Sequence, residues 1–222
     1  MDLAHWQGQL WLQRDFCLLA GASGDTQPHA HYAHQAMLAL QDPLRLLIDG
    51  RPVSERFVLV ESLCPHAFVE PGQPLLALYA EPLAFSAATL RGVLGDVPTE
   101  PQALLARLQQ APRQPLDERV AQALQAVDEL LQDRLGAASL AQQVCLSLSQ
   151  LERLFGVQVG LSVRRLVLWR RLRLALLLSW SGSSLTEAAH AAGFADSAHF
   201  SRTVRSMFGV QAQSLRHLRL VD

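Results

Sequence analysis

The chain has 222 residues, of which 50% are hydrophobic, so it can bury one substantial core or two small ones, and we expect two domains. The net charge of −1 divides unevenly: residues 1–135 carry 9 Arg and 16 acidic residues, and residues 136–222 carry 10 Arg and 4 acidic residues, which indicates a polyanion partner for the second part alone. The apolar run Leu174 to Leu178 is far too short to span a membrane, while three scattered cysteines and a start without a basic and apolar leader favour a reduced, cytoplasmic protein.

Short strand-like runs fill the chain from residue 6 to residue 79. Gly, Pro and Asp separate them, for example at Asp49-Gly50 and Pro71-Gly72. The runs are LWLQRDFCLLA, QAMLALQ, LRLLIDG, RFVLVESL and PLLALYAEP. We predict a small, mostly β domain over residues 1–82.

Histidines gather in this domain at His29, His31 and His34, with His66 downstream. Alternate residues of a strand face the same side, so we expect His29 and His31 to point together. The β domain resembles the cupins, whose usual motif is His-x-His, then three or four residues, then Glu, with a later His on a neighbouring strand. Gln35 stands in the place of the Glu, which removes the anionic ligand. Two interpretations stay open: His29, His31 and His66 bind a divalent metal, or they are polar residues in a degenerate pocket without a cofactor.

A helical stretch, PQALLARLQQAP, lies in the predicted connector over residues 83–114. Prolines bound it on both sides, and its apolar face includes Leu104, Leu105 and Leu108. This face fits a dimer seam and packing within the chain equally well.

Helical periodicity replaces the strand pattern beyond Pro115. The stretch LDERVAQALQAVDELLQDRLG puts apolar residues on one stripe, namely Val120, Leu124, Val127, Leu131 and Leu135. Three helix starts show the capping-box spacing, in Ser139 with Gln142, Ser147 with Gln150, and Ser184 with Glu187. We predict an all-α domain over residues 115–222.

Two helix-turn-helix units are predicted in this domain, over residues 139–157 and 184–210. In each, a second short helix has apolar anchors beneath and polar residues outside, which is the layout of a helix that reads the major groove of DNA. The candidate base-reading residues are Ser149, Gln150, Glu152 and Arg153 in the first unit, and Ser197, Ala198, His199, Ser201 and Arg202 in the second.

A linker helix is predicted between the two units, from about Val163 to Leu178. At about 1.5 Å per residue it would be roughly 24 Å long, which suits two readers in successive major-groove faces about 34 Å apart. Arginines are dense here, and we expect them to contact phosphates without reading sequence. The phosphate candidates are Arg164, Arg165, Arg170 and Arg171, together with Arg205 in the second unit.

The pieces SLAQQVCLS, LERLFG, LLSWSGSSLTEAAHAAGF and DSAHFSRTVRSMFGV resemble the AraC-type transcriptional regulators over roughly residues 115–220. The resemblance implies a seven-helix domain with two helix-turn-helix units joined by a rigid helix, in which Leu148–Gly156 and Asp196–Ser206 are the recognition helices. It also implies a cupin-like sensor domain at the N-terminal end. Gln211 and Ala212 depart from the family, which usually has a small polar residue and Pro there, so the start of the last helix is expected to be less well capped.

The sequence therefore predicts an α+β protein of two domains, with a small cupin-like β domain followed by an all-α domain that carries both helix-turn-helix units. We expect a DNA-binding transcriptional regulator without catalytic activity. Double-stranded DNA is its expected partner, and an effector, RNA polymerase and a second copy of the chain are further candidates. Two rivals stay open: a metal-dependent cupin enzyme with an accessory helical domain, and a helical adaptor that binds other proteins.

Overall fold

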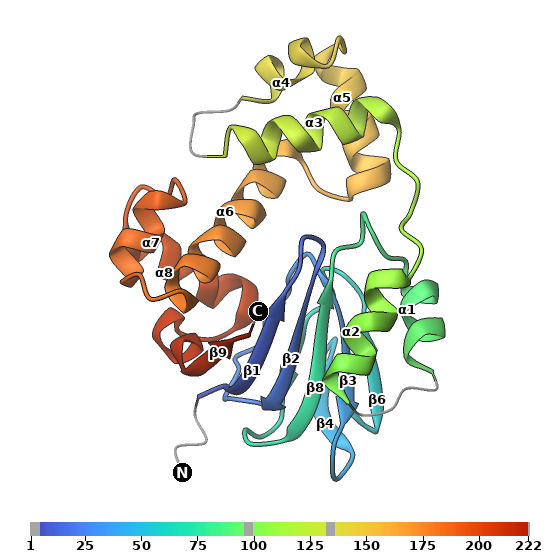
Figure 1. The fold of residues 1–222 in the computed structure, drawn as a ribbon, viewed down its shortest axis with the longest axis vertical. Coiled ribbons are helices and arrows are strands. Elements are labelled where there is room, and N and C mark those ends of the chain that lie inside the picture. Colours follow the sequence, from blue (N-terminus) through green and yellow to red (C-terminus); the bar gives the residue numbers. More distant parts are fainter. Residues whose placement is uncertain (1–4, 96–99, 132–135, 222) are drawn as a thin grey trace. The chain divides into compact units, whose positions relative to one another are not determined.

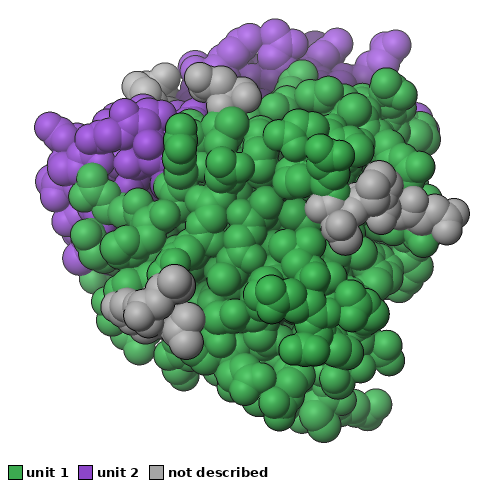
Figure 2. Space-filling model, turned by 60° about the horizontal axis from the view of Figure 1, so that its bottom comes forward, with its two compact units in different colours: residues 1–113, 201–222 green, residues 114–200 purple. Residues whose placement is uncertain are grey.

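The computed structural model describes residues 5–95, 100–131 and 136–221. The chain divides into two compact units, of which unit 1 comprises residues 1–113 and 201–222 and unit 2 comprises residues 114–200 (Figure 2). The boundary between them falls inside the helix α8 (Ser197–Phe208). The C-terminal residues therefore group with the N-terminal β region.

Unit 1 is built on two sheets, a six-stranded sheet of order β6-β3-β8-β2-β1-β9 and a three-stranded sheet of order β5-β4-β7 (Figure 1). Paired strands are antiparallel except β9, which runs parallel to β1. The strands are β1 (Gln7–Leu12), β2 (Phe16–Ala22), β3 (His34–Ala39), β4 (Leu44–Ile48), β5 (Arg51–Glu55), β6 (Phe57–Val60), β7 (His66–Phe68), β8 (Pro74–Ala80) and β9 (Leu218–Leu220). The predicted β domain is thus confirmed, and it contains more strands than the strand-like runs expected from the sequence.

The most apolar predicted run forms the central strand β8. Leu75, Leu76 and Leu78 are at most 2% exposed, so both faces of β8 are covered, and this is why its sequence is continuously apolar instead of alternating. The first predicted run divides into β1 and β2, because the backbone amide of Gln13 donates to the carbonyl of Phe16 at 2.8 Å and closes a hairpin.

Two helices follow the strands in unit 1, α1 (Ala87–Leu94) and α2 (Pro101–Gln110). The sequence predicts α2, and its first helical residue is a proline, which suits that position. It misses α1, although the Ser86 hydroxyl caps that helix by accepting from the Thr89 amide. Leu104 and Leu108 are at most 1% exposed within the chain, so packing in unit 1 accounts for them.

Unit 2 is helical. Its helices are α3 (Glu118–Glu129), α4 (Ala137–Gln143), α5 (Leu148–Leu154), the π-helix η1 (Phe155–Val159), α6 (Val163–Trp180) and α7 (Leu185–Ala191), followed by the first residues of α8. Val120, Leu124 and Val127 are buried as the periodicity of α3 predicts, whereas Leu135 lies outside the described residues. No helix within the described ranges is both long and apolar enough to cross a bilayer.

Two of the three predicted helix starts are confirmed. Ser147 with Gln150 and Ser184 with Glu187 form complete capping boxes, in which each serine side chain accepts from the backbone three residues on and the reciprocal side chain accepts from the serine amide. The start at Ser139 is wrong, because α4 begins at Ala137 and Ser139 lies inside its first turn.

The C-terminal segment departs from the all-α expectation. After α8 comes a 3-10 helix, η2 (Ala212–His217), whose N-cap Gln211 makes no side-chain capping bond. The next residues, Leu218–Leu220, form β9 and not a helix. β9 forms because the outer edge of β1 offers backbone groups to which these residues can hydrogen-bond. The amide of Val221, for example, donates to the carbonyl of Leu10 at 2.9 Å.

Candidate nucleic-acid interface and histidine cluster

The helix α5 separates its apolar and polar residues as a reading helix requires. Leu151 and Phe155 are fully buried in unit 2. The four candidate base-reading residues, Ser149, Gln150, Glu152 and Arg153, are all exposed. Gln150 also has a local task, because its side-chain oxygen accepts from the Ser147 amide at 3.0 Å and closes the cap. A base contact by Gln150 would compete with this bond.

The helix α8 shows the same division. Phe200 and Val204 are fully buried, whereas Ala198, Arg202 and Arg205 are exposed. Three other candidates, Ser197, His199 and Ser201, are half-buried. The ring of His199 packs edge-on against Phe194 at 5.2 Å between centroids. Ala198 and Arg202 are therefore the most accessible of the second set.

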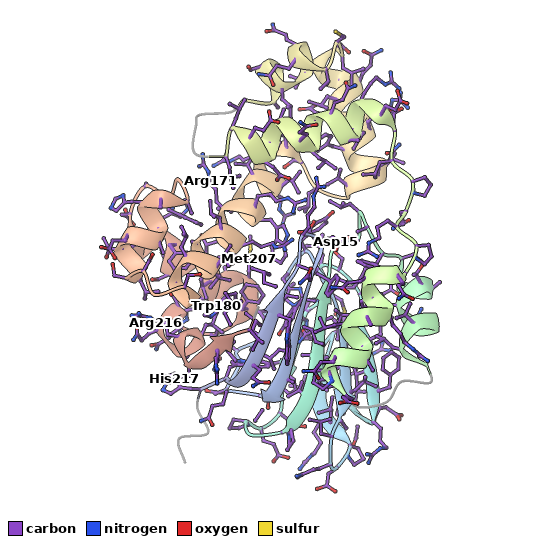
Figure 3. The ribbon with its side chains drawn as sticks, viewed as in Figure 1. Asp15, Arg171, Trp180, Met207, Arg216 and His217 are labelled. Carbon is purple, nitrogen blue, oxygen red and sulfur yellow. The ribbon has the colours of Figure 1, made fainter. Side chains whose placement is uncertain are left out.

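The arginines of α6 have two different roles. Arg164 and Arg165 are exposed in its first turn, where the Ser162 hydroxyl caps the helix. Arg170 lies 3.3 Å from Asp128 of α3 in an ion pair. The Nε of Arg171, which is labelled in Figure 3, donates to the carbonyl of Leu131 at 2.8 Å. These last two side chains hold α6 to the α3 region, so Arg164 and Arg165 are the accessible phosphate candidates of this helix.

In unit 1, His29, His31 and His66 lie together beside Gln35, and we call these four residues the histidine cluster. The imidazole ligand atoms lie within 4.8 Å of one another, and all three rings are at most 8% exposed. His29 and His66 face each other across a β-bridge, where each amide donates to the other's carbonyl. The cluster thus joins the loop before β3 to the first residue of β7. The sequence expectation that His29 and His31 point together is confirmed, although neither lies in a named strand.

The histidine cluster has a consistent hydrogen-bond pattern. Each Nδ1 lies 2.9 Å from a backbone carbonyl two residues away, at Gln27 for His29, at Ala33 for His31 and at Cys64 for His66. The side-chain oxygen of Gln35 lies 2.7 Å from Nε2 of His66 and 3.3 Å from Nε2 of His31. Its amide nitrogen donates to the Tyr79 hydroxyl at 3.0 Å.

Burial keeps these rings neutral. It lowers the pKa of His29 from 6.5 to about 4, with the His66 ring as a second cause. It also lowers the pKa of His31 well below 6.5 and lowers that of His66. With a proton on Nδ1 for the carbonyl bond, each neutral ring offers a lone pair at Nε2.

The end of α8 lies against the histidine cluster within unit 1. The Phe208 ring is 5.5 Å from the His31 ring and 6.0 Å from the Tyr79 ring. Gly209 follows with a φ of 68°, and its carbonyl accepts from the Gln27 amide at 3.0 Å. A glycine after a helix signals its end, but no sequence signal places that end beside histidines so far away in the chain.

A neighbouring cavity of about 220 Å³ is lined by residues of the same unit, among them His5, Asp25, Gln27 and Arg205. His5 stacks on His217 of η2 at 4.6 Å between ring centroids. The C-terminal segment is thus fixed to the β region by β9, by this stack and by the contacts of Gly209.

Comparison with known proteins matches residues 140–217 to a helix-turn-helix domain family. The arabinose operon regulatory protein of Escherichia coli is 37% identical over 107 residues, which is 46% of this chain and 36% of that protein. The Salmonella typhimurium protein of the same name is also 37% identical over 107 residues. The chain thus spans little more than a third of the length of these relatives.

Solved structures of ToxT from Vibrio cholerae match nearly the whole chain. One at 12% identity covers 92% of this chain and 99% of ToxT with a TM-score of 0.55. Another, with an unsaturated fatty acid bound to ToxT, is 11% identical and covers 91% of this chain and 95% of ToxT with a TM-score of 0.58. At this identity the likeness concerns the fold, and it extends over both units. Residues 140–217 thus match a helix-turn-helix domain, a stretch of 107 residues is similar to the arabinose operon regulatory proteins, and the fold of the chain is similar to that of ToxT.

Proposed function

We propose that the protein regulates transcription by binding a specific DNA sequence, with α5 and α8 as its two reading helices. The observation that carries the proposal is the division of both helices into a buried apolar side and an exposed side with base-reading chemistry. Arg153 of α5 and Arg202 of α8 are exposed, and an arginine can make two hydrogen bonds to guanine.

Phosphate contacts are assigned to the exposed arginines Arg164, Arg165 and Arg205. They belong to a part of the chain, residues 136–222, with 10 Arg and only 4 acidic residues. Their contacts would position the protein on the duplex and release counterions without reading bases.

We assign the control of DNA binding to unit 1. ToxT has been solved with an unsaturated fatty acid bound, and its fold covers both units of this chain. We therefore expect an effector to act through the β region on the reading helices. A second copy of the chain and RNA polymerase are the protein partners proposed for activity on a promoter.

Selection of bound fragments from random DNA by the purified full-length chain tests this function. We expect one consensus whose affinity is at least about 10³-fold above that of random DNA, and a steep fall of affinity with salt. A consensus with two adjacent recognition sites per bound chain would support two reading helices in one polypeptide. Two such pairs of sites in a palindromic arrangement would support a dimer. Equal affinity for all sequences, or no salt dependence, would refute the proposal and favour an adaptor that binds proteins.

A further inference from the structure

We propose that the histidine cluster binds one divalent cation and that this binding acts on the C-terminal end of α8 through Gln27 and Gly209. The inference deepens the proposed regulatory function, because it names the effector class and the route of control. Its consequence for DNA binding rests on that function, whereas the metal site and its effect on α8 do not.

The tautomer of each ring is the first support. All three Nδ1 atoms lie 2.9 Å from a backbone carbonyl, so Nδ1 carries the proton and Nε2 carries the lone pair. Histidines that bind metals show this arrangement, because the second hydrogen bond fixes the ring and raises its basicity. The three buried rings thus make the same kind of hydrogen bond at Nδ1, and the partners described for the rings are backbone carbonyls and the side-chain oxygen of Gln35.

Gln35 supplies the second support. Its side-chain oxygen lies 2.7 Å from Nε2 of His66, and both atoms are acceptors when Nδ1 holds the ring proton. Two acceptors repel each other at this distance, most strongly in a buried site. A cation among the Nε2 atoms and the amide oxygen removes this conflict.

The donor set defines the class of cation. Three neutral imidazoles with one amide oxygen suit Zn²⁺, Co²⁺, Ni²⁺ or Cu²⁺, whereas Mg²⁺ and Ca²⁺ prefer sets of carboxylate and other oxygen ligands. The imidazole ligand atoms lie within 4.8 Å of one another. Bonds of about 2.1 Å in a tetrahedral site would bring such atoms to roughly 3.4 Å, so binding draws the rings inward.

An inward movement of His29 reaches α8 through two hydrogen bonds. The Nδ1 of His29 is bonded to the Gln27 carbonyl, and the Gln27 amide is bonded to the Gly209 carbonyl at 3.0 Å. The fit at residue 209 is tight, since a Cβ there would lie 2.8 Å from Nδ1 of His29 and 2.2 Å from the Gln27 oxygen. The backbone of Gly209 therefore lies close against the loop that carries His29, so movement of this loop acts on Gly209 through the hydrogen bond from Gln27.

A second contact reaches the same turn. The ring of Phe208, the last residue of α8, lies 5.5 Å from the His31 ring. The same helix begins with the candidate base-reading residues Ser197, Ala198 and His199. A ligand alters an equilibrium only when it favours one arrangement over another, and the inward movement of the rings supplies that preference.

Metal binding is tested first, on the full-length chain without an affinity tag and after treatment with a chelator. Titration with ZnCl₂ followed by desalting and elemental analysis should give one Zn²⁺ per chain. The binding should be lost in His31→Gln and in His66→Gln and kept in His34→Gln, which changes a buried histidine outside the cluster. Circular dichroism checks the folding of each variant, and Co²⁺ absorption of the unaltered protein gives a readout that needs no variant.

The alternative orientation of the Gln35 side-chain amide predicts the result that would overturn the metal site. If the Gln35 amide is turned by 180°, its nitrogen donates to His31 and His66 and its oxygen accepts from Tyr79, so the cluster is a complete network without a metal. The unaltered protein would then bind no Zn²⁺ and show no Co²⁺ spectrum, and the proposal would be overturned.

The link to α8 is tested by hydrogen exchange of residues 201–212 with and without ZnCl₂. We expect exchange there to change by about fivefold or more, in the range of ordinary coupling between sites. Phe208→Leu should keep Zn²⁺ binding and reduce this response. An unchanged exchange rate in metal-loaded protein would overturn the proposed link.

Affinity for the selected DNA with and without ZnCl₂ completes the test. A change of about fivefold or more in the unaltered protein, reduced in Phe208→Leu, supports control by the cation. Metal binding and altered exchange in a protein without sequence-specific DNA binding would refute the proposed function and leave the metal site intact. Sequence-specific DNA binding whose affinity does not change with Zn²⁺ would refute control by the cation and leave the proposed DNA-binding function intact.

Discussion

The backbone amide of Gln27 donates a hydrogen bond to the carbonyl of Gly209 at 3.0 Å. This bond joins the loop that precedes the histidine cluster to the residue that follows α8. The approach is close because residue 209 has no side chain: a Cβ there would lie 2.2 Å from the Gln27 oxygen. A glycine that ends α8 in the left-handed region is thus the point at which the β region holds the C-terminal end of this helix.

Gly209→Ala should lower the free energy of unfolding by about 3 kcal/mol or more, because the methyl group meets the Gln27 backbone and the left-handed φ is strained. Gly160→Ala is the matched control, since Gly160 has a φ of 75° and a Cβ there meets nothing within 4 Å. The control should cost only about 1 to 2 kcal/mol. Denaturant unfolding followed by circular dichroism measures both, and equal costs would show that the close approach is relieved by movement.

Ser147→Ala should destabilise unit 2 by about 1 kcal/mol, because the Gln150 amide loses the hydroxyl that caps α5. Ser139→Ala should change stability by less than about 0.5 kcal/mol, since this exposed serine lies inside α4. Thermal unfolding of the two variants measures the difference. A larger cost at Ser139 than at Ser147 would contradict the assigned start of α4.

The second capping box should depend on pH, and the first should not. Hydrogen bonds from the Ser184 side chain and backbone lower the pKa of Glu187 below its usual 4.5. Because the folded pKa is the lower one, the cap contributes stability above about pH 4.5 and loses it as pH falls through the folded pKa. Unfolding of the unaltered protein and of Glu187→Gln, measured from pH 3 to 7, should differ in slope only in this acidic window. Parallel curves would indicate that Glu187 does not cap α7 in solution.

Arg202→Ala should cost about 1 to 3 kcal/mol on the selected DNA and relax preference at one base pair. Arg165→Ala should weaken specific and random DNA alike and reduce the salt slope by about one unit. Fluorescence anisotropy over a salt series separates these effects. The same loss on both DNAs for Arg202→Ala would assign this residue to the phosphates.

Arg171→Ala should act on stability more than on DNA. Its guanidinium donates to the carbonyl of Leu131, so its loss should cost about 1 to 2 kcal/mol of unfolding free energy. Arg164→Ala, at an exposed position of the same helix, should leave stability unchanged within about 0.5 kcal/mol. A normal melting temperature and a reduced salt slope for Arg171→Ala would return this residue to the phosphate set.

The helices of unit 2 were the most predictable part of the fold, because their signals are local. The linker helix begins at Val163 as predicted and ends two residues beyond the predicted Leu178. Ser147 and Ser184 start their helices because the capping partner is three residues away. Ser139 has the same spacing without that role, since spacing alone does not say whether a serine precedes a helix or lies inside it.

The sites were less predictable. Arg164 and Arg170 look alike in the sequence, but only the fold brings Asp128 beside Arg170. Likewise, His66 and Phe208 lie beside His31 only because segments far apart in the chain pack together.

The sequence by itself determined what depends on neighbours along the chain: helix periods, the caps at Ser147 and Ser184, the division of charge and the exposed polar faces of α5 and α8. The tertiary structure decided what depends on distant segments meeting, namely the histidine cluster, the pairing of β9 with β1 and the contact of Gly209 with Gln27. The physical reason is that helix hydrogen bonds close within four residues, whereas sheet pairing and side-chain packing carry no fixed separation in sequence.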